Sequence, residues 1–123
     1  RKASYRTMSP VEAAYIGGLF DGEGSGIIDH YRNRLCSTKI KLTVVNTDPE
    51  LISACLRATG CGSIHYRPIR SGTAQLLNSN KPIFDWIVNA WNDALGILHQ
   101  LRPYSVKAQS VLLKLSEAYG APV

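Results

Sequence analysis

The segment that most constrains the fold of this chain runs from Ser9 to Gly24 and reads SPVEAAYIGGLFDGEG. Ser9, Pro10 and Glu12 predict the start of a helix, because a serine N-cap, a proline at N1 and a glutamate at N3 together form a capping box. The residues that follow predict that the helix continues to about Asp21. The segment therefore predicts a well-capped helix that ends in two acids set among glycines.

Three small residues of this helix, Ala14, Gly18 and Gly22, lie four positions apart and form one strip along it, called here the small-residue strip. Glycine inside a helix costs about 1 kcal/mol relative to alanine, so we expect the strip to have a purpose. A strip without bulky side chains lets another backbone approach closely. From spacing alone, the neighbour is either a helix of the same chain or a helix of another molecule.

Asp21 and Glu23 lie at the C-terminal end of the predicted helix, where the helix dipole disfavours negative charge. Acids in such a place, beside glycines that permit close approach, suggest ligands for a metal ion. Mg²⁺ prefers oxygen ligands and is commonly held by one or two carboxylates together with phosphate oxygens. A solvated turn is the alternative interpretation of this Asp-x-Glu sequence.

The rest of the chain shows alternating strand and helix patterns. Four strands are predicted by period-two alternation and turn residues, over 27–31, 37–45, 63–67 and 73–78. Three further helices are predicted by cap and stop residues, over 48–60, 80–100 and 103–119. This order predicts an α+β fold with one antiparallel sheet and its helices on one face. The 123 residues are expected to form a single domain, 1–123.

Composition places the chain among ordinary globular proteins, with 45% hydrophobic and 19% charged residues. A net charge of +5 is a modest indication of a polyanionic partner. No apolar run approaches the roughly 18 residues of a membrane span, and residues 1–10 lack the apolar part of a secretory signal. We therefore expect no membrane partner and an intracellular protein, in the cytoplasm or an organelle matrix, and not a secreted one.

The segment from Ile16 to Gly24, IGGLFDGEG, resembles the LAGLIDADG motif of homing endonucleases position for position. Blocks that follow resemble the same family in the same order, at residues 25–28, 42–52 (LTVVNTDPELI), 59–62 (TGCG) and 101–109 (LRPYSVKAQ). The resemblance implies the family fold, αββαββα, with a saddle-shaped antiparallel sheet and helices on one face. Because only one motif is present, the chain is similar to the single-motif members, which are homodimers whose motif helices meet along the small-residue strip.

The activity implied by the resemblance is that of a site-specific, double-strand DNA endonuclease. Such an enzyme binds a long pseudo-palindromic target as a homodimer and hydrolyses one phosphodiester on each strand with a divalent metal. Mg²⁺ or Mn²⁺ is the implied cofactor, and Ca²⁺ is expected to bind without supporting cleavage. An intron RNA maturase and a non-cleaving DNA-binding protein are alternatives on the same fold.

The resemblance also assigns catalytic residues. Glu23 matches the metal-binding acid, and Asn46 falls where relatives often place a glutamine near the metal-bound water. Lys107 is the best match to the lysine of the catalytic pocket, with Arg102 as the alternative. Asp21 is expected to cap or brace the end of the motif helix, with metal binding as the other reading.

The face of the sheet without helices is implied to read base edges in the major groove, where each base pair presents its own pattern of donors and acceptors. Alternation along the strands selects the candidate readers Ile27, Asp29, Tyr31, Ser37, Lys39, Lys41, Thr43, Ser63, His65, Arg67, Thr73 and Gln75. Phosphate contacts are expected from the hairpin arginines Arg32, Arg34 and Arg70. Asp29 would either accept a hydrogen bond from cytosine or pair with a neighbouring arginine.

Overall fold

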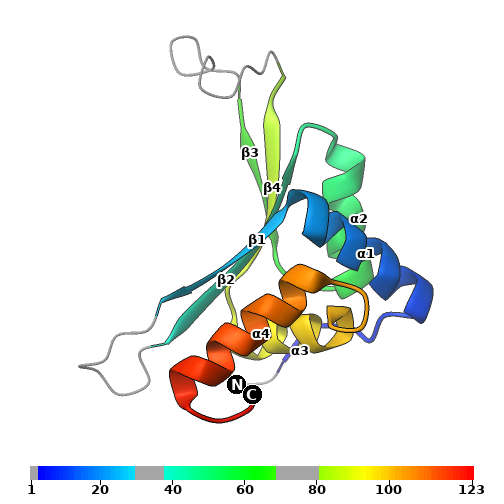
Figure 1. The fold of residues 1–123 in the computed structure, drawn as a ribbon. Coiled ribbons are helices and arrows are strands. Elements are labelled where there is room, and N and C mark those ends of the chain that lie inside the picture. Colours follow the sequence, from blue (N-terminus) through cyan, green and yellow to red (C-terminus); the bar gives the residue numbers. More distant parts are fainter. Residues whose placement is uncertain (1–2, 30–37, 69–80) are drawn as a thin grey trace.

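The computed structural model describes residues 3–29, 38–68 and 81–123, whose arrangement is shown in Figure 1. The helices and strands within these residues are α1 (Pro10–Glu23), β1 (Gly24–Asp29), β2 (Lys39–Asn46), α2 (Pro49–Thr59), β3 (Ser63–Arg67), β4 (Ile83–Val88), α3 (Trp91–Leu101) and α4 (Val106–Tyr119). Their order is the predicted one, so the α+β class is confirmed.

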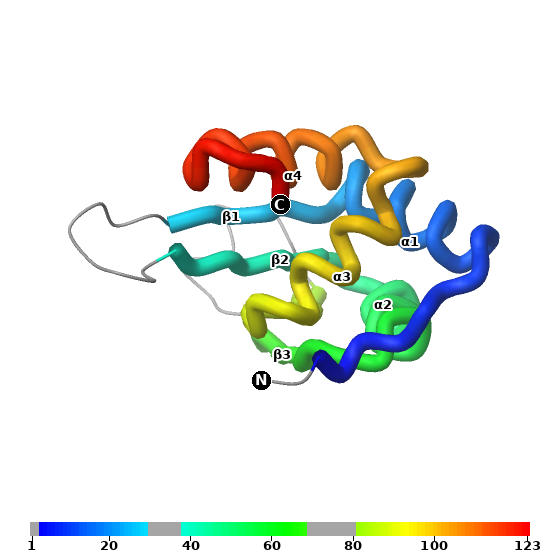
Figure 2. The backbone as a smooth tube through the Cα atoms, turned by 90° about the horizontal axis from the view of Figure 1, so that it is seen from below, coloured from blue at the N-terminus to red at the C-terminus, as the bar shows by residue number. Residues whose placement is uncertain are grey.

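The described strands form one antiparallel sheet in the order β1-β2-β4-β3. Figure 1 shows two arms, the β1–β2 pair and the β3–β4 pair, which diverge from the middle of the sheet and give it the shape of a saddle. The helices lie on one side of the sheet, and the view from below in Figure 2 shows α4 alongside β1. The other side of the sheet is left without a covering helix in the described part of the chain.

The core fills the space between the sheet and the helices. Ile40, Leu42 and Val44 alternate along β2 and are buried together with Trp86 of β4 and Phe20 of α1. Burying a large apolar side chain stabilises a fold by about 1.5–3 kcal/mol, so this alternation fixes which face of each strand points to the helices. No helix in the described part of the chain is long and apolar enough to cross a membrane.

The predicted helix over residues 80–100 is wrong in its first half. Ile83–Val88 is β4, which pairs with β2 on one side and along the whole of β3 on the other. The physical reason is tertiary: the fully buried Trp86 can reach the core from a strand that completes the sheet, and the β-branched Ile83, Ile87 and Val88 favour that conformation. The predicted strand at 73–78 lies outside the described residues, and the strand that pairs with β3 is β4.

The predicted helix ends are mostly confirmed. Ser9 and Glu12 form the capping box of α1, and Gly60 and Gly120 end α2 and α4 in the left-handed conformation with φ of 72° and 71°. The last helix begins later than predicted, because the hydroxyl of Ser105 accepts a hydrogen bond from the amide of Ala108 at 3.0 Å and so acts as its N-cap. The first strand begins at Gly24 and not at 27.

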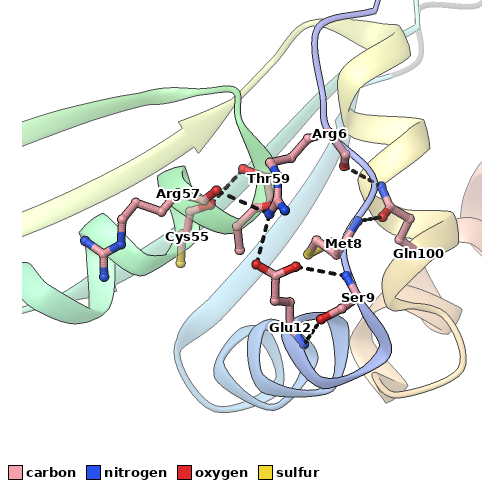
Figure 3. A network of polar contacts seen from close by, with 9 residues as sticks. Arg6, Met8, Ser9, Glu12, Cys55, Arg57, Thr59 and Gln100 are labelled. Atoms are coloured by element: carbon pink, nitrogen blue, oxygen red, sulfur yellow. Dashed lines mark hydrogen bonds and ion pairs between the residues drawn. The ribbon is translucent and has the colours of Figure 1, made fainter.

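The residues before α1, 3–9, form an N-terminal strap that binds to α3. The carboxylate of Asp93 accepts hydrogen bonds from the amides of Ser4 and Tyr5 at 2.6 and 3.0 Å. The side chain of Gln100 accepts from the amide of Met8 at 2.6 Å and donates to the carbonyl of Arg6 at 3.2 Å (Figure 3). The strap therefore fixes how α1 enters the fold.

Arg6 connects the strap to two more helices. Its guanidinium donates to the carbonyl of Ala58 at 2.7 Å, at the C-terminal end of α2, and forms an ion pair with Glu12 of α1 at 2.9 Å. Its backbone amide donates to the carbonyl of Thr59 at 2.8 Å. Figure 3 shows these contacts around Arg6, which joins the first turn of α1 to the C-terminal end of α2.

We expect Arg6→Ala to lower the free energy of unfolding by about 1 kcal/mol, because it removes the hydrogen bond of the guanidinium to the Ala58 carbonyl of α2. Urea denaturation followed by circular dichroism measures the change. Arg57→Ala is the matched control, since its guanidinium points away from the network in Figure 3, and it should change the free energy by less than about 0.5 kcal/mol. Equal losses in the two variants would contradict a specific role for the Arg6 contacts.

Candidate functional site

The candidate site begins where α1 runs directly into β1. Glu23 is the last residue of α1 and is exposed, and Gly24 is the first residue of β1. A Cβ atom at Gly24 would overlap the ring and the backbone of Phe20, so only glycine fits here, where the helix passes directly into the strand. The junction therefore fixes the backbone of Glu23 beside the sheet.

Asp21 binds the start of α4. Its carboxylate accepts hydrogen bonds from the hydroxyl of Ser105 at 2.6 Å and from the amides of Lys107 and Val106 at 3.0 and 3.2 Å. Amides at a helix N-terminus lack partners within their own helix and carry the positive end of its dipole, so a carboxylate stabilises them. Asp21 thus caps the neighbouring helix α4, and the same hydrogen bonds brace the end of α1 against it.

These contacts shift the pKa of Asp21. Burial raises the pKa of this carboxyl, but the hydrogen bonds from Ser105 and from the Lys107 and Val106 amides lower it by more, and the charge of Lys107 lowers it further. The net result is a pKa below the ordinary value of 3.8. Asp21 therefore stays ionised at neutral pH while it holds α4.

Lys107 lies beside the α1–β1 junction. Its ammonium donates a hydrogen bond to the carbonyl of Gly24 at 2.7 Å, so it lies next to the residue that follows Glu23. Arg102, the alternative, is exposed at the C-cap of α3 and lines a groove between α3 and α4 with His99 and Gln109. The geometry brings Lys107, and not Arg102, to the end of α1.

Asn46 is the last residue of β2 and lies at the same end of the sheet as Glu23. Gly24 pairs with Val44, so Asn46 is two residues beyond the partner of Gly24. Its side-chain oxygen accepts a hydrogen bond from the amide of Asp48 at 2.8 Å, in the turn that leads into α2. This contact fixes the side chain of Asn46 between the strand and the next helix.

The small-residue strip is uncovered. Gly18 and Gly22 are exposed, and a Cβ atom at either would meet no other described atom within 4 Å. Gly17 is different, because a Cβ there would lie 3.1 Å from the Cβ of Tyr104. Packing within the described chain therefore explains why residue 17 is glycine, but it does not explain the small residues of the strip.

The exposed side chains on this side of α1 become smaller towards its C-terminus. Val11 and Tyr15, near its N-terminus, are 80% and 51% exposed, and Gly18 and Gly22 of the strip follow towards its C-terminus. Residues three and four apart share a helix face, so bulky apolar groups and small residues form one continuous surface. A second helix can approach this surface most closely at the end that carries Glu23.

The face of the sheet opposite the helices, called here the open face, is defined by alternation and by the register of the strands. Two contacts support the assignment: Ser25 and Thr43 share a hydrogen bond of 2.7 Å across β1 and β2, and Ser63 and His65 share one of 3.0 Å along β3. In the described part of the chain this face carries Ser25, Ile27, Asp29, Lys39, Lys41, Thr43, Val45, Ser63, His65, Arg67, Ile83, Asp85 and Ile87.

The candidate base readers that the structure describes all lie on the open face: Ile27, Asp29, Lys39, Lys41, Thr43, Ser63, His65 and Arg67. Outside the described residues lie the remaining candidate readers, Tyr31, Ser37, Thr73 and Gln75, and the candidate phosphate contacts Arg32, Arg34 and Arg70. The open-face residues of β4 are missed because that segment is predicted as a helix. Alternation of Asp85 with the aromatic Phe84 and Trp86, among β-branched residues, is the signal that could have found them.

The open face carries mixed charge in its described part. Asp29 is the register partner of Lys39, and Asp85 forms an ion pair with Arg67 at 2.9 Å. Apolar side chains lie among them, of which Ile27 is 50% exposed. Charged groups of both signs and apolar side chains therefore share this face, so its described part is not uniformly basic.

The described part of the chain does not bring its own acids, histidines and cysteines together as a metal site. In residues 3–29, 38–68 and 81–123, no three histidine, cysteine or acidic side chains gather in a way that could hold a metal ion. At the end of α1 the available ligand is the Glu23 carboxylate, because Asp21 is occupied by α4. A metal at this place would need further oxygen ligands besides this carboxylate.

No protein-family model and no curated protein matches this sequence, but solved structures do. The homing endonuclease I-CvuI, in complex with a DNA target, is 20% identical with a TM-score of 0.56, over 84% of this chain and 63% of its own. The archaeal intron-encoded homing endonuclease I-Vdi141I, complexed with DNA, is 19% identical with a TM-score of 0.59, over 89% and 68%. The LAGLIDADG homing endonuclease I-SmaMI, bound to cleaved DNA, is 16% identical with a TM-score of 0.56, over 87% and 35%.

This chain has the LAGLIDADG homing endonuclease fold. At identities of 20% or less the likeness concerns the fold, and the chain spans less than two thirds of the length of I-CvuI. In this LAGLIDADG fold the IGGLFDGEG segment forms the last part of α1 and the first residue of β1. The predicted saddle-shaped sheet with helices on one face is confirmed.

We expect Asp21→Asn to lower the free energy of unfolding at pH 7 by about 1 kcal/mol, as loss of a helix cap does. Because the pKa of Asp21 is lowered by folding, its stabilisation is present above the ordinary value of 3.8 and is lost as the pH falls through the lower folded value. Urea denaturation between pH 7 and pH 2 should therefore show the two proteins converging in acid.

Asp29→Asn is the control for this measurement, because it removes the same charge from an exposed strand position. Its free energy of unfolding should stay within about 0.5 kcal/mol of the wild type. A difference between Asp21→Asn and the wild type that is the same at every pH would contradict the charge-based account.

Proposed function

We propose that this protein is a site-specific, double-strand DNA endonuclease that acts as a homodimer and holds a divalent metal at Glu23. The observation that carries the proposal is the α1–β1 junction, where the exposed Glu23 lies between the uncovered small-residue strip and the open face of the sheet. The fold supports it, since I-CvuI and I-Vdi141I are homing endonucleases solved in complex with DNA and I-SmaMI was solved with cleaved DNA.

The homodimer is proposed from the surface of α1. A two-fold axis beside the small-residue strip lets the same strip on two copies face itself, as an isologous contact requires. The bulky Val11 and Tyr15 near the start of the helix favour a crossing in which the Glu23 ends are closest. The dimer would then present two carboxylates, one for each DNA strand.

The chemistry is proposed for Glu23 together with DNA. Its carboxylate is a hard oxygen ligand of the kind that Mg²⁺ or Mn²⁺ takes, and phosphate oxygens of the bound DNA would complete the site. The metal, when bound, would lower the pKa of a water and neutralise charge on the leaving oxygen. Lys107, placed by its bond to the Gly24 carbonyl, would offset charge on the phosphate, and Asn46 would orient the water.

Recognition is proposed for the open face. Its two arms would follow the major groove, and the alternating residues of the four described strands would contact base edges in rows that run across the sheet. The hairpin arginines and the readers outside the described residues remain predictions. Phosphate contacts would supply affinity that falls with salt, and open-face contacts would supply the preference for one sequence.

The test is to incubate the protein with randomised duplex DNA and Mg²⁺ and to sequence the ends. We expect one consensus site with approximate two-fold symmetry. Glu23→Gln should bind this site with wild-type affinity and lose at least a hundred-fold in cleavage rate, since even the partners of metal ligands contribute about 10- to 100-fold. Glu117→Gln, the same substitution at an exposed position of α4, is the control and should cut normally.

Two outcomes would count against the proposal. Cleavage by Glu23→Gln at the wild-type rate would show that the metal is held elsewhere. Absence of cleavage from every library, together with tight binding of intron RNA, would replace the endonuclease by the maturase alternative.

The homodimer is tested by Gly18→Leu. Gly18 has no described neighbour within 4 Å, so the chain should still fold, while two leucines would hold the paired helices apart. Sedimentation equilibrium should show a dimer for the wild type and a monomer for the variant. Gly17→Ala is the matched control: its Cβ would meet Tyr104 of the same chain at 3.1 Å, so the subunits should stay together. A wild-type monomer bound to DNA would contradict this part of the proposal.

A further inference from the structure

Asp85 is an acid placed in the middle of the open face. It lies on β4 between Val45 of β2 and His65 of β3, its register partners on either side, and its side chain is only 13% exposed. No helix covers this face in the described part of the chain, so the neighbouring open-face side chains are what shield the carboxylate. On a surface proposed to meet DNA, such a charge opposes the phosphates and calls for a physical reason.

The reason lies in its contact with Arg67. A terminal nitrogen of the guanidinium (Nη2) lies 2.9 Å from Oδ1 of Asp85, and the arginine side chain is 52% exposed. Arg67 is opposite Ile83, so the contact runs diagonally to the next open-face position of β4. Arginine has five N–H donors in one rigid plane, so donors remain for a base after one has met the carboxylate.

We propose that Asp85 is a positioning residue that fixes the guanidinium of Arg67 for reading one guanine-containing base pair in each half of the target. The inference rests on the proposed function, because it assigns sequence discrimination to a pair on the proposed DNA-reading face. Bidentate contact of arginine with guanine needs the planar group at a set angle, and Asp85 holds one edge of that plane. A free arginine can instead swing to a phosphate, a contact that carries no sequence information.

Fold stability is a weaker explanation of the same pair. Ion pairs with a half-exposed partner contribute little to stability because water screens them, and Arg67 is such a partner. The two predicted effects of Asp85 on DNA binding have opposite signs. Its charge lowers affinity for any DNA, and its hold on Arg67 raises the preference for one sequence. A residue that only stabilised the fold would not separate these two quantities.

The experiment is a binding selection from randomised duplex DNA without Mg²⁺, carried out on the full chain. Arg67→Ala should lose the base preference at one base pair of each half-site and so identify the base pair that Arg67 reads. Asp85→Asn should weaken the preference at that same base pair by roughly five-fold or more, with binding to random duplex unchanged or tighter. Asp29→Asn, which removes the same charge from the other arm, should leave the preference at that base pair intact.

A second variant keeps the inference testable if Asp85→Asn does not fold. Arg67→Lys changes an exposed side chain, keeps the charge and removes the planar fork, so it should retain affinity and lose preference as Asp85→Asn does. Wild-type preference in either variant at the Arg67 base pair would overturn this inference alone. A wild-type selection that yields no consensus would instead overturn the proposed function, and this inference with it.

Discussion

The contact between Asp21 and the start of α4 is the interaction on which the candidate site depends. One carboxylate receives the Ser105 hydroxyl and the first amides of α4, and this places Lys107 where its ammonium reaches the Gly24 carbonyl. Glu23 lies between Asp21 and Gly24 in the chain, so the contacts of these two residues with α4 fix the backbone of Glu23 from both sides. Two helices that are far apart in sequence are thereby joined at the point where the proposed chemistry takes place.

Sequence predicts the parts of the fold whose signals are local. The capping box of α1, the glycine stops of α2 and α4 and the alternation of β2 depend on neighbouring residues, and each is found in the structure. The segment 83–88 is different, because its apolar run fits a strand or a buried helix equally well and is decided by pairing with β2 and β3. That single error removes Asp85 and Ile87 from the predicted open face.

The candidate site shows the same division. Position in the motif is enough to nominate Glu23, and spacing is enough to assign Gly18 to the small-residue strip. Only the fold shows that Gly17 faces Tyr104 whereas Gly18 has no described neighbour within 4 Å. Lys107 and Arg102 are likewise close in sequence, and only the fold brings Lys107 to the end of α1. From the sequence, Asp21 is an acid at the C-terminal end of its own helix, where the helix dipole disfavours it. Its partners at the start of α4 are distant in sequence and are found only in the structure.

The absence of a loop between α1 and β1 has a consequence for how a target would be measured. Glu23 and Ser25, the first open-face residue of β1, are separated by one residue, Gly24, whose backbone is confined by Phe20. Under the proposed function, the distance along the DNA between the bond that is cut and the first base pair that is read is therefore set by the covalent chain. Substitutions on the outer parts of the arms could change which sequence is accepted while the position of the break within it stays constant.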